Sequence, residues 1–304
     1  MRSKFISIFL ILFFAKTVFG LTKVGIGTIY ISSKSNLETN YSKIKDYDKP
    51  DKTKTDIIPI GELTFTSKYN GAHISSGLGY SEGAKGLFLN YQNSFSNLGK
   101  FKVQIAFDPF SKEWKNPYLL NDNREKTDVY NYSLNLELKD IKNTNFLFKY
   151  KLRYKDVRKD GIEYSDLKRD TIFKDFILGY SFKTPIRGLI LIPEVAFNTS
   201  KAKGESNSYY GYGLGFSALL FTRYNKFIIK TNFNQRFFQK TDPVFNKTRK
   251  EDLFSLFAVF TFNEPIKIKN TYFTITAGYM IKNTNINFYK ESKLVTGLIV
   301  GYKF

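Results

Sequence analysis

The last residues of the chain, 293–304, have the sequence KLVTGLIVGYKF, and this stretch decides the fold. Its side chains alternate. One face is apolar and aromatic, while the other carries small or apolar residues and a lysine near each end, Lys293 and Lys303. The first face holds Leu294, Leu298, Val300, Tyr302 and Phe304. A period of two is the side-chain period of a β-strand. A strand that ends on a bare phenylalanine needs an apolar environment that its own chain does not supply.

The same alternation recurs along the chain. It is clearest at 100–109, 129–138, 146–155 and 227–238. Each of these segments is about 10 residues long, which is the length of a tilted membrane strand. Weaker strands are expected at 22–33, 56–68, 72–80, 86–95, 171–182, 189–198, 208–221, 252–262, 271–281 and 293–304. The total is about 14 strands, or about 12 if 72–80 and 86–95 are excluded, and an even number is typical of bacterial transmembrane barrels.

The connections between these strands alternate in length. Long polar connections are expected at 34–55, 109–127, 156–170, 199–207, 240–251 and 282–292. The ones between them are mostly short, and Asn70-Gly71 is a strong hairpin-turn signal. Long loops on one side and short turns on the other are typical of a transmembrane antiparallel β-barrel, with the short turns on the periplasmic side.

The first 20 residues resemble a secretory signal peptide. Arg2 and Lys4 precede an apolar run from Phe5 to Ala15, and small or apolar residues stand before a cleavage site after Gly20. The alternative is a membrane anchor, but the run is too short to span a bilayer. We therefore expect residues 1–20 to be a signal peptide and residues 21–304 to be one barrel domain.

Composition excludes several functions. The chain has no cysteine, so neither disulfides nor lipidation of a cysteine is expected. It has one histidine, which rules out a metal site made of histidines, and no cofactor is expected. The net charge of +20 would suit nucleic acid. An exported chain does not routinely meet nucleic acid, so we do not expect it as a partner.

The two faces of the strands indicate a wet interior. Lys, Arg, Asn and Gln occupy one face of the four clearest strands, and long apolar side chains occupy the other. A barrel of this many strands encloses a wide space. In lipid all backbone groups must be paired, so the last strand has to pair with the first. Phe304 then lies at the bilayer surface.

The C-terminal strand resembles that of Gram-negative outer-membrane β-barrel proteins, the class that includes the porins. Those proteins end in phenylalanine with aromatic or apolar residues at alternate positions before it. Phe304, Tyr302, Val300 and Leu298 match this pattern, and Thr296 departs from it. The resemblance implies a location in the bacterial outer membrane, contact with its lipid, and recognition of this strand by the barrel-assembly machinery. It identifies a class and no characterised subfamily.

Aromatic residues near strand ends are expected in the interfacial girdles of the membrane. The candidates are Tyr30, Phe107, Tyr130, Tyr132, Tyr154, Tyr210, Tyr212, Tyr272 and Tyr302.

One short motif, His73-Ile74-Ser75, resembles the His-x-Ser pair of outer-membrane lipid hydrolases. Those enzymes carry a third polar residue about a dozen positions later, where this chain has Leu87. The alternation also places His73 and Ser75 toward the interior, away from a lipid substrate. We therefore expect no enzyme activity and a polar interior role for this pair.

Cations on the polar faces are the candidate functional residues. They are Lys102, Lys149, Lys151, Arg153, Lys155, Lys230 and Arg236. Rings of Lys or Arg select anions in pores. The alternative is a structural ladder in which acids neutralise the cations, with Glu137 near Lys149 and Asp175 near another. The expected function is a porin-like channel for passive diffusion of small hydrophilic solutes, preferentially anions.

A second function remains open, namely a non-conducting, surface-exposed structural or adhesive barrel. Its contacts would come from the loops at 34–55, 109–127 and 156–170. Phe110, Trp114 and Tyr118 in the second loop could anchor a partner or fold inward as a constriction. The pattern leaves open the solute, the oligomeric state and whether loops close the pore.

Overall fold

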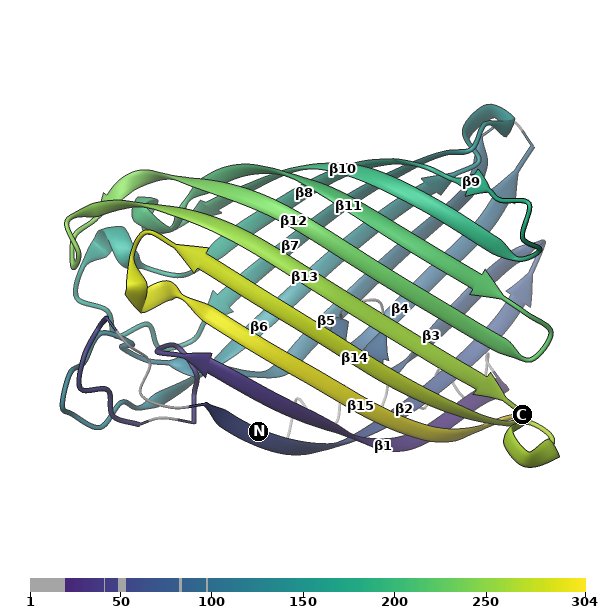
Figure 1. Ribbon diagram of the computed structural model, residues 1–304, viewed down its shortest axis with the longest axis horizontal. Coiled ribbons are helices and arrows are strands. Elements are labelled where there is room, and N and C mark those ends of the chain that lie inside the picture. Colours follow the sequence, from purple (N-terminus) through teal and green to yellow (C-terminus); the bar gives the residue numbers. More distant parts are fainter. Residues whose placement is uncertain (1–19, 41, 49–52, 82–83, 97) are drawn as a thin grey trace.

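The computed structural model is one antiparallel sheet that closes on itself into a barrel of steeply slanted strands (Figure 1). It describes residues 20–40, 42–48, 53–81, 84–96 and 98–304. β1 (Gly20–Ser35) pairs with β15 (Glu291–Lys303) from Lys23 opposite Lys303 to Ser35 opposite Glu291. Of the fifteen strands, β8 (Thr171–Tyr180) and β9 (Phe182–Lys183) lie end to end against one neighbour, so the wall has fourteen positions. The predicted count and the closure of first strand on last are confirmed.

The remaining strands follow the order of the sequence around the wall. They are β2 (Lys54–Tyr69), β3 (Ala72–Ser81), β4 (Ala84–Phe95), β5 (Gly99–Trp114), β6 (Lys126–Lys139), β7 (Phe146–Val157), β10 (Leu189–Ala202), β11 (Tyr209–Phe221), β12 (Asn225–Asp242), β13 (Lys247–Asn263) and β14 (Thr271–Thr284). Short 3-10 turns lie in the connections: η1 (Ile141–Asn143), η2 (Ser165–Leu167), η3 (Glu205–Asn207), η4 (Pro265–Lys267) and η5 (Asn287–Tyr289). In the described parts of the chain, none of the helices is long and apolar enough to cross a membrane.

Long and short connections separate to opposite ends of the barrel, as predicted. The C-terminus lies at the right-hand end in Figure 1, with the short turns, and the long loops gather at the left-hand end. Asn70 and Gly71 form the β2–β3 turn, both with positive φ, at 47° and 79°. Two successive positive φ angles are those of a type I′ hairpin turn. We call the two ends the loop end and the turn end.

Two predicted loops are shorter than expected, because parts of them are strand. The loop expected at 109–127 is shorter because β5 continues to Trp114 and β6 begins at Lys126. The loop expected at 240–251 shrinks to a tight hairpin between β12 and β13. These strands extend past the level where lipid would impose alternation, so their outer ends carry no apolar stripe. The placement of Phe110 and Trp114 in a loop is therefore wrong, since both lie in β5.

Apolar side chains cover the outside of the wall. The C-terminal face that defined the pattern is exposed there, with Phe304 at 68% and Val300 at 48% exposure. Near the loop end, aromatic rings follow one another across neighbouring strands. Phe107 stacks on Tyr132 with ring centroids 4.9 Å apart, and Tyr132 lies 6.2 Å from Tyr154. This aromatic row is the expected girdle on that side.

Tyr272 was expected in a girdle and lies inside instead. Its ring is 1% exposed and crosses the closing seam on the inner surface. The ring fits because Gly25 and Gly301, which face each other across the β1–β15 seam, have no side chains; a Cβ on either would collide with it. Its hydroxyl donates to Glu62 on β2 and to the backbone oxygen of Val24. One side chain thus ties β14 to β1 and β2.

The seam gives a stability prediction. Replacing Tyr272 with alanine should lower the free energy of unfolding by about 3–5 kcal/mol, because it leaves a cavity at the seam and a partly unsatisfied Glu62. Denaturant unfolding of the refolded barrel in detergent measures this. Tyr279→Ala, on the same strand but facing outward and 42% exposed, is the control and should cost much less. Equal losses for the two variants would contradict the proposed role of the seam.

Candidate functional site

The four cations of β7 form a row on the inner surface of the barrel. Lys149 Nζ lies 2.6 Å from Glu194 Oε1 on β10, past the intervening strand β8. Lys155 Nζ lies 3.1 Å from Glu113 Oε1 on β5, past β6. Side chains reach past a neighbouring strand in this way on the concave face of a sheet. The alternation of β7 then places Lys151 and Arg153 on that same face.

The acids pair differently from the expectation. Glu137 lies opposite Lys149 in the β6–β7 register, as expected, but its ion pair is with Lys139 at 2.7 Å. Asp175 lies directly opposite Lys151. Lys149 and Lys155, the two ends of the cation row, are instead neutralised by Glu194 and Glu113, which come from strands beyond the direct neighbours.

Lys151 and Arg153, in the middle of the row, differ from the two end residues in their ion-pair partners. Both are exposed, and neither forms an ion pair with any residue in the described parts of the chain. The Arg153 guanidinium lies 4.2 Å from the ring centre of Phe173 on β8. A contact with a ring does not neutralise the charge of Arg153, and no described acid lies within ion-pair distance of it. The row thus presents to the interior two cations that have no described acid within ion-pair distance, with Asp175 on the neighbouring strand opposite Lys151.

The other candidate cations lie on the inner faces of β5 and β12. Lys102 is opposite Glu137, and Lys230 is opposite Ser217. Arg236 lies 3.7 Å from Glu251 and 4.8 Å from the ring centre of Tyr209. The structure does not collect all seven candidates in one ring.

Arg153 and Arg236 each lie over an aromatic ring, and these two rings are neighbours. Phe173, under Arg153, lies 6.5 Å from Tyr209, under Arg236, between ring centroids. Sequence patterns gave no signal for this cluster of two arginines on two aromatic rings.

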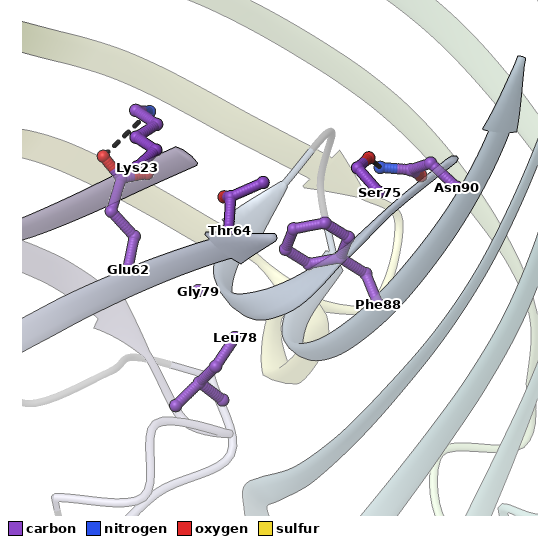
Figure 2. A pocket seen from close by; sticks show the side chains of 8 residues that line it. All are labelled: Lys23, Glu62, Thr64, Ser75, Leu78, Gly79, Phe88 and Asn90. Carbon is purple, nitrogen blue, oxygen red and sulfur yellow. Dashed lines mark hydrogen bonds and ion pairs between the residues drawn. The ribbon is translucent and has the colours of Figure 1, made fainter. Parts of the chain in front are cut away.

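A pocket of about 170 Å³ lies on the inner surface near the turn between β3 and β4 (Figure 2). Its lining residues are Lys23, Glu62, Thr64, Ser75, Leu78, Gly79, Phe88 and Asn90. Lys23 forms an ion pair with Glu62 at 2.8 Å, and Asn90 Nδ2 donates to Ser75 Oγ at 3.2 Å. His73, two residues from Ser75, is not among the lining residues. In the parts of the chain described, no group of three or more His, Cys, Asp or Glu side chains could hold a metal ion.

At the loop end, several loops pack on one another. Their buried residues are Ile44, Ile286, Phe288 and Tyr289, with Leu37, Tyr47, Tyr118 and Phe245 packed around them. We call these eight residues the aromatic cap. Phe288 stacks on Tyr118 at 5.2 Å and lies 5.3 Å from Phe245, so the cap joins loops that come from well-separated strands.

Hydrogen bonds fix the cap. The Tyr118 and Tyr289 hydroxyls are 2.7 Å apart, and Tyr289 donates to Asp242 at 2.5 Å. Burial raises the pKa of both tyrosines above the usual range, so both hydroxyls stay neutral at physiological pH. Arg124 donates to the backbone oxygen of Asn36 at 2.7 Å, and burial lowers its pKa to about 10, which still leaves it charged at neutral pH. Of the three aromatic residues expected as an anchor or a constriction, Tyr118 is the one in the cap.

The closed wall, the apolar outer surface with its aromatic row and the charged interior define a transmembrane β-barrel of the bacterial outer-membrane class. The chain belongs to the family described as "Protein of unknown function (DUF2860)", whose model matches residues 21–303. A search of curated proteins finds no match.

Solved structures with a similar arrangement of strands include an outer-membrane channel and an anion-selective porin. The COG4313 outer membrane channel from Pseudomonas putida F1 is 8% identical over 93% of this chain and 96% of that chain, with a TM-score of 0.45. The anion-selective porin from Comamonas acidovorans is 9% identical over 94% and 100%, with a TM-score of 0.40. OccAB4 from Acinetobacter baumannii is 9% identical over 93% and 97%, with a TM-score of 0.38. At these identities the likeness concerns architecture alone.

Proposed function

We propose that this barrel is a passive channel for small hydrophilic solutes and that it prefers anions. The observation that carries the proposal is the exposed, unpaired state of Lys151 and Arg153 on the inner face of β7. A fixed charge inside a low-dielectric wall attracts mobile counter-ions strongly, because the wall focuses its field. Lys149 and Lys155 contribute less, since Glu194 and Glu113 neutralise them.

Solute uptake by liposomes tests the proposal. Refolded protein is inserted into liposomes that are then diluted into isotonic glucose, gluconate or glucosamine. These three solutes share one carbon skeleton and differ in charge. The expected order of swelling rates is gluconate, then glucose, then glucosamine. Equal swelling rates or the reversed order would contradict the proposed preference for anions. Swelling no faster than in protein-free liposomes would contradict the proposed channel.

The aromatic cap favours the second candidate, a structural or adhesive barrel without conduction. Its residues are tightly packed, with Phe288 1% and Ile44 3% exposed, so the loops form a folded surface at the loop end. Liposomes that fail to swell although the barrel is correctly folded would support this candidate.

A further inference from the structure

The inner face of β3 has two positions without a side chain. Alternation directs Gly77 and Gly79 toward the interior, on the same face as Ser75. Phe88 on β4 lies directly opposite Gly77, and a Cβ on Gly77 would come within 2.8 Å of the Cζ atom at the tip of the Phe88 ring. The ring therefore lies across β3 and does not stand upright from the wall. Because Phe88 is half-buried in this position, one face of its ring is turned toward the interior.

Polar side chains border the Phe88 ring on two sides. Figure 2 shows the ring between Thr64 of β2 and the pair Ser75–Asn90, in which Asn90 Nδ2 donates to Ser75 Oγ at 3.2 Å. The Oδ1 atom of Asn90 is buried and has no hydrogen-bond partner among the described residues. A buried acceptor without a partner costs about 1–3 kcal/mol. This oxygen therefore requires a donor from a water molecule or from a bound ligand.

The two charged residues that line the pocket, Lys23 and Glu62, neutralise each other. Lys23 Nζ lies 2.8 Å from Glu62 Oε1, and the same carboxylate oxygen accepts a hydrogen bond from Tyr272. An anion at the pocket would gain little from Lys23, because Glu62 lies beside it and would repel the anion. The pocket thus favours a neutral ligand, in contrast to the middle of the cation row on β7.

The pocket has room for one six-membered ring. Its volume of about 170 Å³ is similar to that of an apolar cavity of about 150 Å³ that holds a benzene molecule. A purely apolar ring would leave Asn90 Oδ1 unpaired, and an open-chain polyol would present no flat face to Phe88. A sugar in its six-membered ring form meets both requirements. Its C–H groups provide an apolar face, and the hydroxyl groups around its edge can bond to Asn90, Thr64 and Ser75.

We propose that this pocket binds a neutral sugar ring, one face of which packs on Phe88 while a hydroxyl group at its edge donates to Asn90 Oδ1. The site lies on the inner wall of the barrel over β2, β3 and β4. It goes beyond the proposed anion channel, since it uses neither Lys151 nor Arg153. Binding there also does not require that the barrel conducts ions.

Saturation-transfer NMR with glucose tests the ligand class on the refolded barrel, held in a detergent whose headgroup is not a sugar. Glucose should give a saturable signal. Sorbitol, which has the same carbon skeleton as an open chain, should bind at least about tenfold more weakly, a factor that corresponds to 1.4 kcal/mol. Glucuronate, which adds a carboxylate to the same ring, should bind no more tightly than glucose. Tighter binding of sorbitol or glucuronate than of glucose would overturn the assignment of a neutral sugar ring.

Two substitutions test the location of the site. Phe88→Leu removes the flat ring but keeps an apolar side chain, and Asn90→Leu removes the unpaired acceptor. Each should weaken glucose binding at least about tenfold. Phe257→Leu is the matched control. Phe257 on β13 lies opposite Gly278, where a Cβ would come within 2.9 Å of its ring, but it does not line the pocket. This variant should bind glucose as the wild type does.

Heat-modifiable gel mobility shows whether each variant is folded. Absence of saturable glucose binding by the folded wild type would overturn the site and leave a water molecule as the partner of Asn90 Oδ1. Equal glucose affinities of the folded Phe88→Leu, Asn90→Leu and Phe257→Leu variants would overturn the assignment of this pocket. Neither result depends on conduction, so the sugar site and the proposed channel can fail separately.

Discussion

Replacing Lys151 and Arg153 together with glutamate is expected to reverse the sign of the reversal potential measured across a planar bilayer in a KCl gradient. The two wild-type side chains present positive charge without acidic partners in ion-pair contact, and Asp175 stands opposite Lys151. After the exchange, the inner face of β7 would carry two glutamates beside Asp175, and this stretch would attract potassium rather than chloride. The shift should shrink at high salt, because mobile ions screen exposed charges.

The control for this exchange is Lys142→Glu. Lys142 is an exposed lysine in the η1 turn at the turn end, away from the inner row. The same kind of charge reversal there should leave the reversal potential nearly unchanged. If the β7 double variant kept the wild-type reversal potential, selectivity would not reside in this row.

Replacing Phe288 with alanine is expected to raise the single-channel conductance several-fold. Phe288 is 1% exposed and contacts Tyr47, Tyr118 and Phe245 in the aromatic cap. Loss of a buried ring of this kind costs about 3–5 kcal/mol of packing. Loops that depend on this packing would then open more often, while the strand pairing of the wall would remain intact.

The barrel itself should not respond to this change. The heat-modifiable gel mobility of Phe288→Ala should match that of the wild type. Tyr224→Ala removes an aromatic residue, 47% exposed, from a connection at the turn end, and it should alter neither quantity. Unchanged conductance in a folded Phe288→Ala protein would show that the cap does not restrict the pore.

The sequence was sufficient to predict the wall. Lipid outside and water inside impose a strict alternation, so Leu298, Val300, Tyr302 and Phe304 alone indicate the C-terminal strand, its outward face and its need for a partner strand. Recognition of this strand by the barrel-assembly machinery and cleavage after residue 20 remain predictions, and residues 1–19 lie outside the described residues.

Contacts inside the barrel were less predictable. Register pairs a residue with its direct neighbours, which is why Glu137 was expected to neutralise Lys149. Long side chains on a concave surface reach farther, and Lys149 binds Glu194 two strands away instead. Tyr272 has the sequence signature of a girdle residue, and only the facing glycines Gly25 and Gly301 explain its inward position.

The cap could not be predicted from local pattern. The cap brings together side chains from four connections, such as Ile44, Tyr118 and Phe288, that have no shared periodicity.

The most direct test of the proposed function is the single-channel current of the refolded wild-type protein in a planar bilayer under a KCl gradient. A channel lined by Lys151 and Arg153 predicts discrete openings and a reversal potential displaced toward the chloride equilibrium value. Absence of conductance from correctly folded protein would contradict the channel, and a reversal potential displaced toward the potassium value would contradict its preference for anions.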